Sequence, residues 1–322
     1  MKDIHHRDTE TQRREDLEKA IALSSSLRHS SSLPLSSPGL PLCLRASVVN
    51  AFSPAFTLIE LLVTIAIIGL LLSILMPSLR NVIAASRTAK CLSNQRQLAL
   101  AWSLYAGDYK DHAVPAAYWQ TRFIGTGPVL YWFGADSPTA PPGSGTLMPY
   151  LNTARAERSA LECPEQPSGT YTPQTQNLKV STTYGYNGYY LSPEMTPGWA
   201  NEIAFRPWRK LTDIRSPSSL LVFADTLLAS VNATTLPRST ALLDPPMLYS
   251  QYAGWQTNSS PTTAFRHGLK QKSNVASHAD GSATQTIVPT DLLKRDSKGR
   301  FLGTGNLSKT PDPGYIPDWE QW

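Results

Sequence analysis

The chain has 322 residues, enough for one sizeable domain with an anchor or for two small domains. Its 29 basic and 24 acidic residues give a formal net charge of +5 and include no run of five like charges, which argues against a nucleic-acid-binding protein. With 26 prolines and 19 glycines, much of the chain is predicted to form turns and loops.

The first fifty residues differ from the rest. Residues 1–19 are densely charged with mixed sign, and residues 24–44 are rich in Ser, Leu and Pro. This composition offers little apolar patterning from which to build a core. We therefore expect the segment to be disordered or removed by processing.

An apolar run of twenty residues, FTLIELLVTIAIIGLLLSIL, occupies positions 56–75. A helix of this length rises about 30 Å, which matches the hydrocarbon core of a bilayer. Residues 56–76 are thus predicted to form a transmembrane helix. Arg45 precedes the span, so the amino-terminal side is expected in the cytoplasm and the rest of the chain on the other side of the membrane.

Glu60 is the one charged residue inside this run. A carboxylate in hydrocarbon costs roughly 2 to 4 kcal/mol, so it must be neutralised, paired or near the interface. A free amine on Phe56 of a neighbouring copy would be a suitable partner, because the two charges offset each other's desolvation. Such an amine requires cleavage between Ala55 and Phe56.

The helix is expected to continue past the membrane. Pro77 removes one backbone donor and is predicted to kink the helix or mark a local break. Apolar residues recur at helical spacing from Leu79 to Tyr105, while basic residues mark the opposite face. Residues 77–107 are therefore predicted to form an amphipathic second half that ends near Gly107.

After Gly107 the chain changes to short β-prone runs separated by loops rich in Pro, Gly and Ser. The runs occupy positions 129–133, 182–191, 220–224, 274–277 and 283–288. Residues 108–322 are expected to form one α+β head whose antiparallel sheet packs on the amphipathic part of the helix. The predicted architecture is a lollipop, a long amino-terminal helix with a globular head.

The string AFTLIELLV at positions 55–63 resembles the processing site of type IV prepilins and type II secretion pseudopilins. In that family a small residue precedes the cut, Phe follows it, Glu is fifth in the mature chain, and a proline is common where Pro77 stands. The resemblance implies that a prepilin peptidase of the inner membrane cuts after Ala55 and methylates Phe56. Glu60 would then guide assembly by pairing with the new amine.

The leader implied by this cut is residues 1–55. The family usually has a basic residue just before the cut, whereas here the nearest one is Arg45. A start downstream of Met1, at Val48 or Val49, would give a short leader.

Further pieces resemble large prepilin-type proteins of the Planctomycetes–Verrucomicrobia kind. They are positions 91–98, Cys163-Pro164, positions 184–187, and Arg266-His267-Gly268 followed by Asp280-Gly281. In that group the last pieces form a carboxy-terminal H…DG signature without an assigned role.

Cys91 and Cys163 remain if Cys43 leaves with the leader. In an oxidising compartment they could form a disulfide worth roughly 2 to 4 kcal/mol, or stay as two buried thiols. No Cys/His cluster has zinc spacing, so no metal site is predicted.

The resemblance to pseudopilins permits a Ca²⁺ site in a carboxy-terminal loop. Acidic residues there are Asp291, Asp296, Asp312 and Asp318. Because their spacing matches no calcium-binding loop, they are expected to be solvated, and no cofactor is predicted.

His267, His278 and Asp280 could indicate a hydrolase, but the sequence contains neither G-x-S-x-G nor H-E-x-x-H. A structural role is favoured, and no enzymatic activity is expected. Aromatic residues could form a ligand platform, although such residues more often anchor cores and loops. They are Trp119, Tyr131, Trp132, Trp199, Trp208 and Trp255.

The sequence thus predicts a structural subunit of a type IV pilus-like filament or a pseudopilus, with a single membrane pass and a periplasmic head. Expected partners are prepilin peptidase, other pilin subunits, an assembly ATPase, a platform protein and the membrane, without nucleic acid. Alternatives are an adhesin or ligand-binding head on the same anchor, and a membrane-tethered hydrolase using His267 or His278. The resemblance fits a filament that serves secretion, adhesion, motility or DNA uptake. It fits a major subunit and a minor subunit equally.

Overall fold

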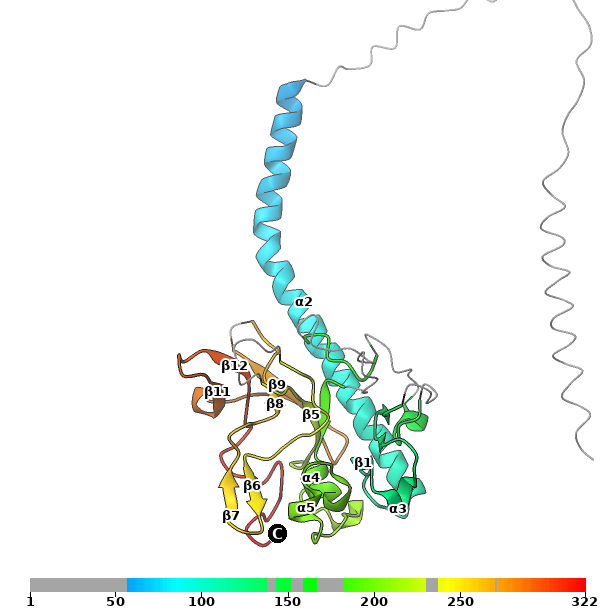
Figure 1. The fold of residues 1–322 in the computed structure, drawn as a ribbon. Helices are drawn as coiled ribbons and strands as arrows, with labels where there is room; N and C mark the ends of the chain where they lie inside the picture. The colour runs from blue at the N-terminus through cyan, green and yellow to red at the C-terminus, as the bar shows by residue number, and fades with distance from the viewer. Residues whose placement is uncertain (1–56, 138–142, 152–158, 167–181, 230–236, 270) are drawn as a thin grey trace, which may run out of the picture. The chain divides into compact units, whose positions relative to one another are not determined.

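A computed structural model describes residues 57–137, 143–151, 159–166, 182–229, 237–269 and 271–322 (Figure 1). The chain divides into two compact units, Met1–Glu60 and Leu61–Trp322. The predicted cleavage residues Ala55 and Phe56, and Cys43, lie outside the described residues.

One continuous helix, α2, runs from Leu58 to Asp108 and ends one residue after the predicted Gly107 (Figure 1). It passes through Pro77, so the proline does not break the helix, and the kink stays a prediction. By length and composition α2 is able to cross a membrane. Its large apolar side chains are exposed from Leu58 to Ile83, so among the described residues none covers this part of the helix.

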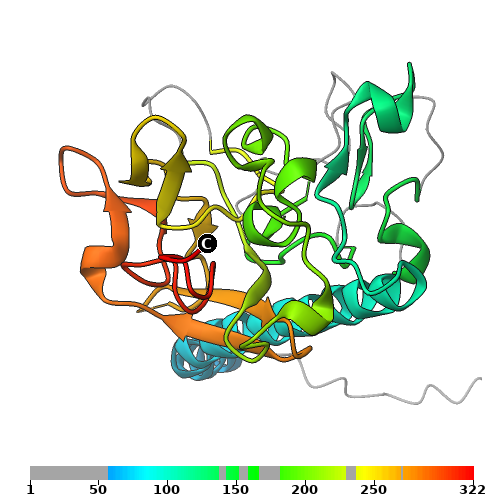
Figure 2. The ribbon, with the colours of Figure 1, turned by 90° about the horizontal axis from the view of Figure 1, so that it is seen from below.

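The later turns of α2 are buried along one face. Cys91, Leu98, Trp102 and Tyr105 follow one another at intervals of three to seven residues and pack into the hydrophobic core. This spacing keeps them on one side of a helix with 3.6 residues per turn. The amphipathic half of α2 therefore packs along one side of the head (Figure 2).

The main sheet has four antiparallel strands in the order β10-β9-β5-β4. Their bounds are Tyr184–Tyr186 for β4, Leu221–Asp225 for β5, Ser273–His278 for β9 and Ala283–Ile287 for β10. All five residues of β5 are buried, as expected for a central strand covered on both faces. Together with α2, this sheet confirms the predicted α+β, pilin-like architecture.

The predicted strand at 182–191 is shorter than expected. It ends at Tyr186, and Gly188–Leu191 forms a helical turn, α4. The Asn187 amide donates hydrogen bonds to the carbonyl oxygens of Leu221 in β5 and of Tyr315, at 2.9 and 2.8 Å, and so ties the end of β4 to the last segment of the chain.

Smaller elements complete the head (Figures 1 and 2). The short sheets comprise β1 Ala117–Tyr118, β2 Leu130–Tyr131 and β3 Gly134–Ala135; β6 Met247–Ser250 and β7 Gly254–Thr257; and β8 Thr263–Ala264, β11 Leu293–Arg295 and β12 Phe301–Gly305. Short helices are α3 Thr121–Ile124 and α5 Ala200–Ile203, with 3₁₀ turns at Met148–Tyr150, Pro193–Met195, Leu211–Asp213 and Thr290–Leu292.

Aromatic side chains join the helix to the sheet. The ring of Phe223 in β5 lies 5.0 Å from that of Trp132 and 5.1 Å from that of Tyr186. Trp102 of α2 donates a hydrogen bond from Nε1 to the Tyr186 hydroxyl, at 3.3 Å. Large aromatics bury about 150–250 Å² each, so this contact fixes the second half of α2 firmly against the head.

Candidate functional site

The start of α2 is closed by two residues that hydrogen-bond each other. The Thr57 backbone N–H donates to Glu60 Oε2 at 2.9 Å, and the Glu60 backbone N–H donates to Thr57 Oγ1 at 3.2 Å. The Thr57 hydroxyl also donates to Glu60 Oε2, at 2.8 Å. This is a capping box, in which Thr57 precedes the helix and Glu60 is its third residue.

The capping box gives the carboxylate of Glu60 a role within its own chain. It supplies an acceptor for the first free N–H group and places a negative charge at the positive end of the helix dipole. The carboxylate nevertheless remains exposed. It is therefore able to accept a further bond from another chain.

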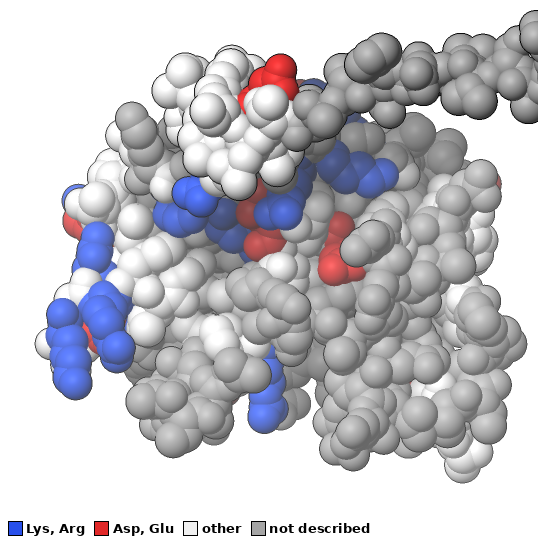
Figure 3. Space-filling view, turned by 90° about the horizontal axis from the view of Figure 1, so that it is seen from above, with Lys and Arg blue, Asp and Glu red and all other residues white. Residues whose placement is uncertain are grey.

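The turns that follow Glu60 present an exposed apolar surface. Leu62, Ile67, Leu71 and Leu75 are each more than half exposed. In Figure 3 the exposed end of the helix is covered by uncharged side chains apart from one acidic patch. Such a surface requires lipid or the apolar surface of another chain as its neighbour.

Residues 54–76 match the family model for the prokaryotic N-terminal methylation motif. The chain carries a pilin-type methylation motif. This match covers Ala55, Phe56 and Glu60, and it implies processing by prepilin peptidase and assembly with other pilin subunits. Together with the long apolar helix it supports membrane anchoring of this pilin-like chain. No curated protein and no solved structure matches the chain.

A second group of chemically active side chains lies inside the head. One ligand atom from each of its four members lies within 4.8 Å of all the others, and every member is fully buried. The four residues are Cys91, Cys163, Asp225 and His267. We call them the buried tetrad.

Separate elements deliver the tetrad. Cys91 belongs to α2, and Asp225 is the last residue of β5. Cys163 follows a turn, and the Cys163 N–H donates a hydrogen bond to Thr183 Oγ1 at 2.6 Å. The backbone of His267 pairs with Ser273 at the start of β9. Gly268 makes the return turn at φ 84°, and a Cβ there would lie 2.2 Å from a carbonyl oxygen, so only glycine fits.

His267 is the centre of the tetrad. Its Nε2 lies 2.8 Å from Asp225 Oδ2 and 3.3 Å from Cys163 Sγ. Cys91 Sγ lies 3.5 Å from Asp225 Oδ1. Burial alone would lower the pKa of His267, but the bonds to Asp225 and Cys163 raise this pKa to about 10. The same bond holds the pKa of Asp225 below its ordinary value against the effect of burial.

Three of these four residues stand out in the sequence, but not as one group. His267 is predicted to belong to a signature, and the two cysteines to form either a disulfide or two buried thiols. In the structure both cysteines are free, and the disulfide stays a prediction. Asp225 was missed, although an acidic residue directly after the apolar run 220–224 is an available signal.

His278, which the hydrolase alternative invoked, and the signature residues Asp280 and Gly281 lie elsewhere. His278 Nε2 lies 2.8 Å from Thr284 Oγ1. Asp280 accepts a bond from the Ser282 N–H at 2.9 Å in the β9–β10 turn, where Gly281 has a φ of 85°. The predicted H…DG signature therefore divides into one tetrad residue and one turn.

The predicted aromatic residues make packing and hydrogen-bond contacts within the head. Trp199 donates to Asp244 Oδ1 and Trp208 to the Ala113 carbonyl, each at 2.8 Å. Trp255 packs edge-on against Trp319. Trp132 is buried in the core, Tyr131 is partly buried against it, and Trp119 is partly buried.

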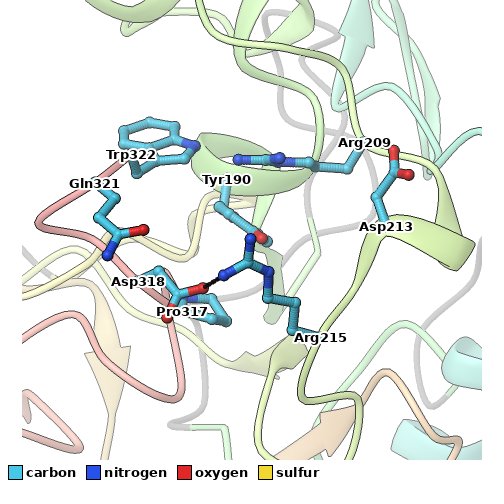
Figure 4. A pocket seen from close by; sticks show the side chains of 8 residues that line it. All are labelled: Tyr190, Arg209, Asp213, Arg215, Pro317, Asp318, Gln321 and Trp322. Carbon is cyan, nitrogen blue, oxygen red and sulfur yellow. Dashed lines mark hydrogen bonds and ion pairs between the residues drawn. The ribbon is translucent and has the colours of Figure 1, made fainter.

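A small surface pocket of about 180 Å³ has a mostly polar lining (Figure 4). Tyr190 and Trp322 line it beside charged residues. Arg215 crosses it to donate to Asp318 Oδ2 at 2.8 Å, and the Arg209 guanidinium lies 4.7 Å from the centre of the Tyr190 ring. Of the pocket's charged residues, Arg215 and Asp318 are thus paired with each other, whereas Arg209 stacks on an aromatic ring.

The late acidic residues also have partners of their own. Asp291 pairs with Lys309 at 3.1 Å, and Asp296 with Arg300 at 2.8 Å. Within the described part of the chain, Asp291, Asp296, Asp312 and Asp318 do not gather into a group that could hold a metal ion.

Proposed function

We propose that this chain is a structural subunit of a thin filament of the type IV pilus or pseudopilus kind. The observation that carries the proposal is the exposed apolar half of α2, which begins at the Thr57–Glu60 capping box inside the methylation motif. Before assembly this half spans the inner membrane once, with the head on the periplasmic side. In the filament it packs against the same half of other copies.

Glu60 sets the register between neighbouring subunits in this proposal. Prepilin peptidase cleaves after Ala55 and methylates Phe56, and the new amine pairs with the carboxylate of an adjacent copy. The capping box supports this role because it orients the carboxylate at the helix start without burying it. An ion pair shielded by lipid or by apolar helices would be geometrically selective, because a misplaced subunit would leave one charge buried and unpaired.

Catalysis is not part of the proposed role. A hydrolase would need His267 or His278 beside a nucleophile in an open cleft. His267 does contact a thiol, but that thiol and the imidazole are closed off from solvent. The assembly work is proposed to come from an ATPase and a platform protein acting on this chain.

The test is to follow the chain from membrane to filament in the cells that produce it. Filaments sheared from the cell surface, or a pseudopilus extended by overproduction, should contain the processed chain. Deleting the assembly ATPase should leave the processed chain in the inner membrane, and deleting the peptidase should leave the unprocessed chain there. Equal release of the chain in all three strains would refute a filament role.

A further inference from the structure

We propose that the head holds one structural metal ion of the zinc class, bound by Cys91, Cys163, Asp225 and His267. The ion would join α2 to the central sheet at the level of β5. This inference concerns the interior of the head and does not depend on the filament role.

The donor set is one that zinc uses. Structural zinc sites are closed and four-coordinate, with thiolate, imidazole and carboxylate ligands. Two soft thiolates with one imidazole select against calcium and magnesium, which prefer oxygen ligands. Four buried side chains with no exposed member match the closed, structural class of site.

The spacing of the donor atoms fits a small tetrahedral ion. Bonds of about 2.0 to 2.3 Å to a tetrahedral zinc place its ligand atoms about 3.3 to 3.8 Å apart. Cys163 Sγ and His267 Nε2 are 3.3 Å apart, and Cys91 Sγ and Asp225 Oδ1 are 3.5 Å apart. The contact between His267 Nε2 and Asp225 Oδ2 is shorter, at 2.8 Å, and would lengthen when the metal replaces the shared proton.

Thr88 orients the imidazole for metal binding. Its Oγ1 lies 3.3 Å from His267 Nδ1 and donates to the Ala84 carbonyl at 3.1 Å. A hydroxyl that donates to a carbonyl accepts from its other neighbour, so His267 donates through Nδ1 and Nε2 is left to bind the ion. A hydrogen bond to the second ring nitrogen is the usual support of a histidine metal ligand.

Other bonds hold the remaining ligands in place. The Val275 N–H donates to Asp225 Oδ2 at 3.2 Å, and the Tyr184 hydroxyl donates to Cys91 Sγ at 3.4 Å. The Tyr184 oxygen in turn accepts from the Asn94 amide at 3.1 Å. Donors aimed at a carboxylate and a sulfur favour their ionised, metal-binding forms.

Charge and access also fit. Zinc with two thiolates, a carboxylate and a neutral imidazole carries a net charge of −1, and the positive charge of Arg266 acts on both Asp225 and Cys163. Thr88, which contacts His267, also lines a surface hollow of about 420 Å³, so the tetrad lies close to the surface on this side. A disulfide would use only the sulfur atoms and leave the His267–Asp225 pair buried in an apolar core, which is costly.

The first experiment uses the full wild-type chain, purified in detergent without chelator. Elemental analysis should find one equivalent of zinc per chain. Chain produced in cobalt-supplemented, zinc-poor medium should show the visible bands of tetrahedral Co²⁺ and a near-ultraviolet thiolate-to-cobalt transition. Cys91 and Cys163 should react with an alkylating reagent only after the metal is chelated.

Variants assign the ligands. Asp225→Asn and His267→Gln should lose the metal, whereas Cys163→His should keep it but show a weaker thiolate-to-cobalt transition, because one thiolate is replaced by an imidazole. His278→Gln is the matched control, since His278 hydrogen-bonds Thr284 outside the tetrad, and it should keep a full equivalent. The Cys163→His spectrum distinguishes a ligand from a merely structural residue.

Wild-type chain with neither zinc nor cobalt would overturn the proposal, whether its cysteines were linked in a disulfide or free without chelator. A full equivalent of zinc in folded Asp225→Asn and His267→Gln would overturn it as well. The measurements on the wild-type chain test the proposal even if the variants do not fold.

Discussion

Replacing Glu60 by Gln separates the two roles of its carboxylate. Gln keeps a side-chain oxygen that accepts the Thr57 N–H, so the capping box survives, but it removes the charge that pairs with the amine of Phe56. Thr57→Val does the reverse, because it removes the hydroxyl that accepts the Glu60 N–H at 3.2 Å and leaves the charge. The two variants are therefore matched.

The expected sizes of the two effects differ. Loss of a capping residue costs about 0.5 to 2 kcal/mol, so Thr57→Val should reduce incorporation by a factor of about 2 to 30. Removing one partner of a buried ion pair costs about 3 to 5 kcal/mol, which corresponds to a factor of about 150 or more at each subunit contact. Glu60→Gln should therefore be nearly absent from filaments.

The assay is competition. Each tagged variant is produced beside the untagged wild type, and the ratio of the two is measured in sheared filaments and in the inner membrane, with cleavage confirmed by the mass of the chain. Wild-type incorporation of Glu60→Gln would refute the ion-pair mechanism. Equal loss in Glu60→Gln and Thr57→Val would assign the effect of Glu60 to the helix cap instead.

Three predictions concern the head, each measured by unfolding of the detergent-solubilised full chain. Burial raises the pKa of Asp244 from 3.8 to about 6. The folded state therefore binds this proton more tightly than the unfolded state, and the free energy of unfolding falls as the pH rises from about 4 to 6. Asp244→Asn should thus be more stable than the wild type by about 3 kcal/mol at pH 8 and nearly equal to it at pH 3. Trp102→Ala should cost about 3 to 5 kcal/mol, whereas Leu100→Ala, 60% exposed on the same helix, should change stability by less than about 1 kcal/mol. Gly188→Ala should cost about 1 to 3 kcal/mol because its Cβ would lie 2.5 Å from a hydroxyl oxygen, while Gly107→Ala, with open space around it, should be neutral or stabilising. Equal effects in either matched pair, or a pH-independent gain for Asp244→Asn, would contradict the packing and burial described above.

Local sequence was enough to predict α2 and four strands of the main sheet. A long apolar run followed by apolar residues at helical spacing predicts the helix. β5, β9 and β10 are short β-prone runs bounded by turns. β6, β7 and β12 were missed. β12 reads FLGTG, and its glycines resemble a loop when the pairing partner is unknown.

Glu60 shows a different kind of omission. Thr57 and Glu60 have the spacing of a capping box, and that signal was present in the sequence. The cost of a carboxylate in hydrocarbon separately calls for a partner in another chain. The structure adds an intrachain partner without removing the need for a counter-ion.

The tetrad could not be predicted from spacing. Cys91 and Asp225 are 134 positions apart, and His267 and Cys163 are 104 apart. Metal motifs are recognisable in sequence when ligands occur in close pairs. Here each ligand comes from a different element, so only the packing of α2 on the sheet reveals the group.

In the proposed mechanism, Glu60 pairs with an amine that prepilin peptidase creates at Phe56. Mass spectrometry of the mature amino terminus, in cells with and without prepilin peptidase, tests it most directly. We predict a chain that begins with N-methylated Phe56 when the peptidase is present and retains the residues before Phe56 when it is absent. A chain that keeps Ala55 attached in both strains would contradict the account.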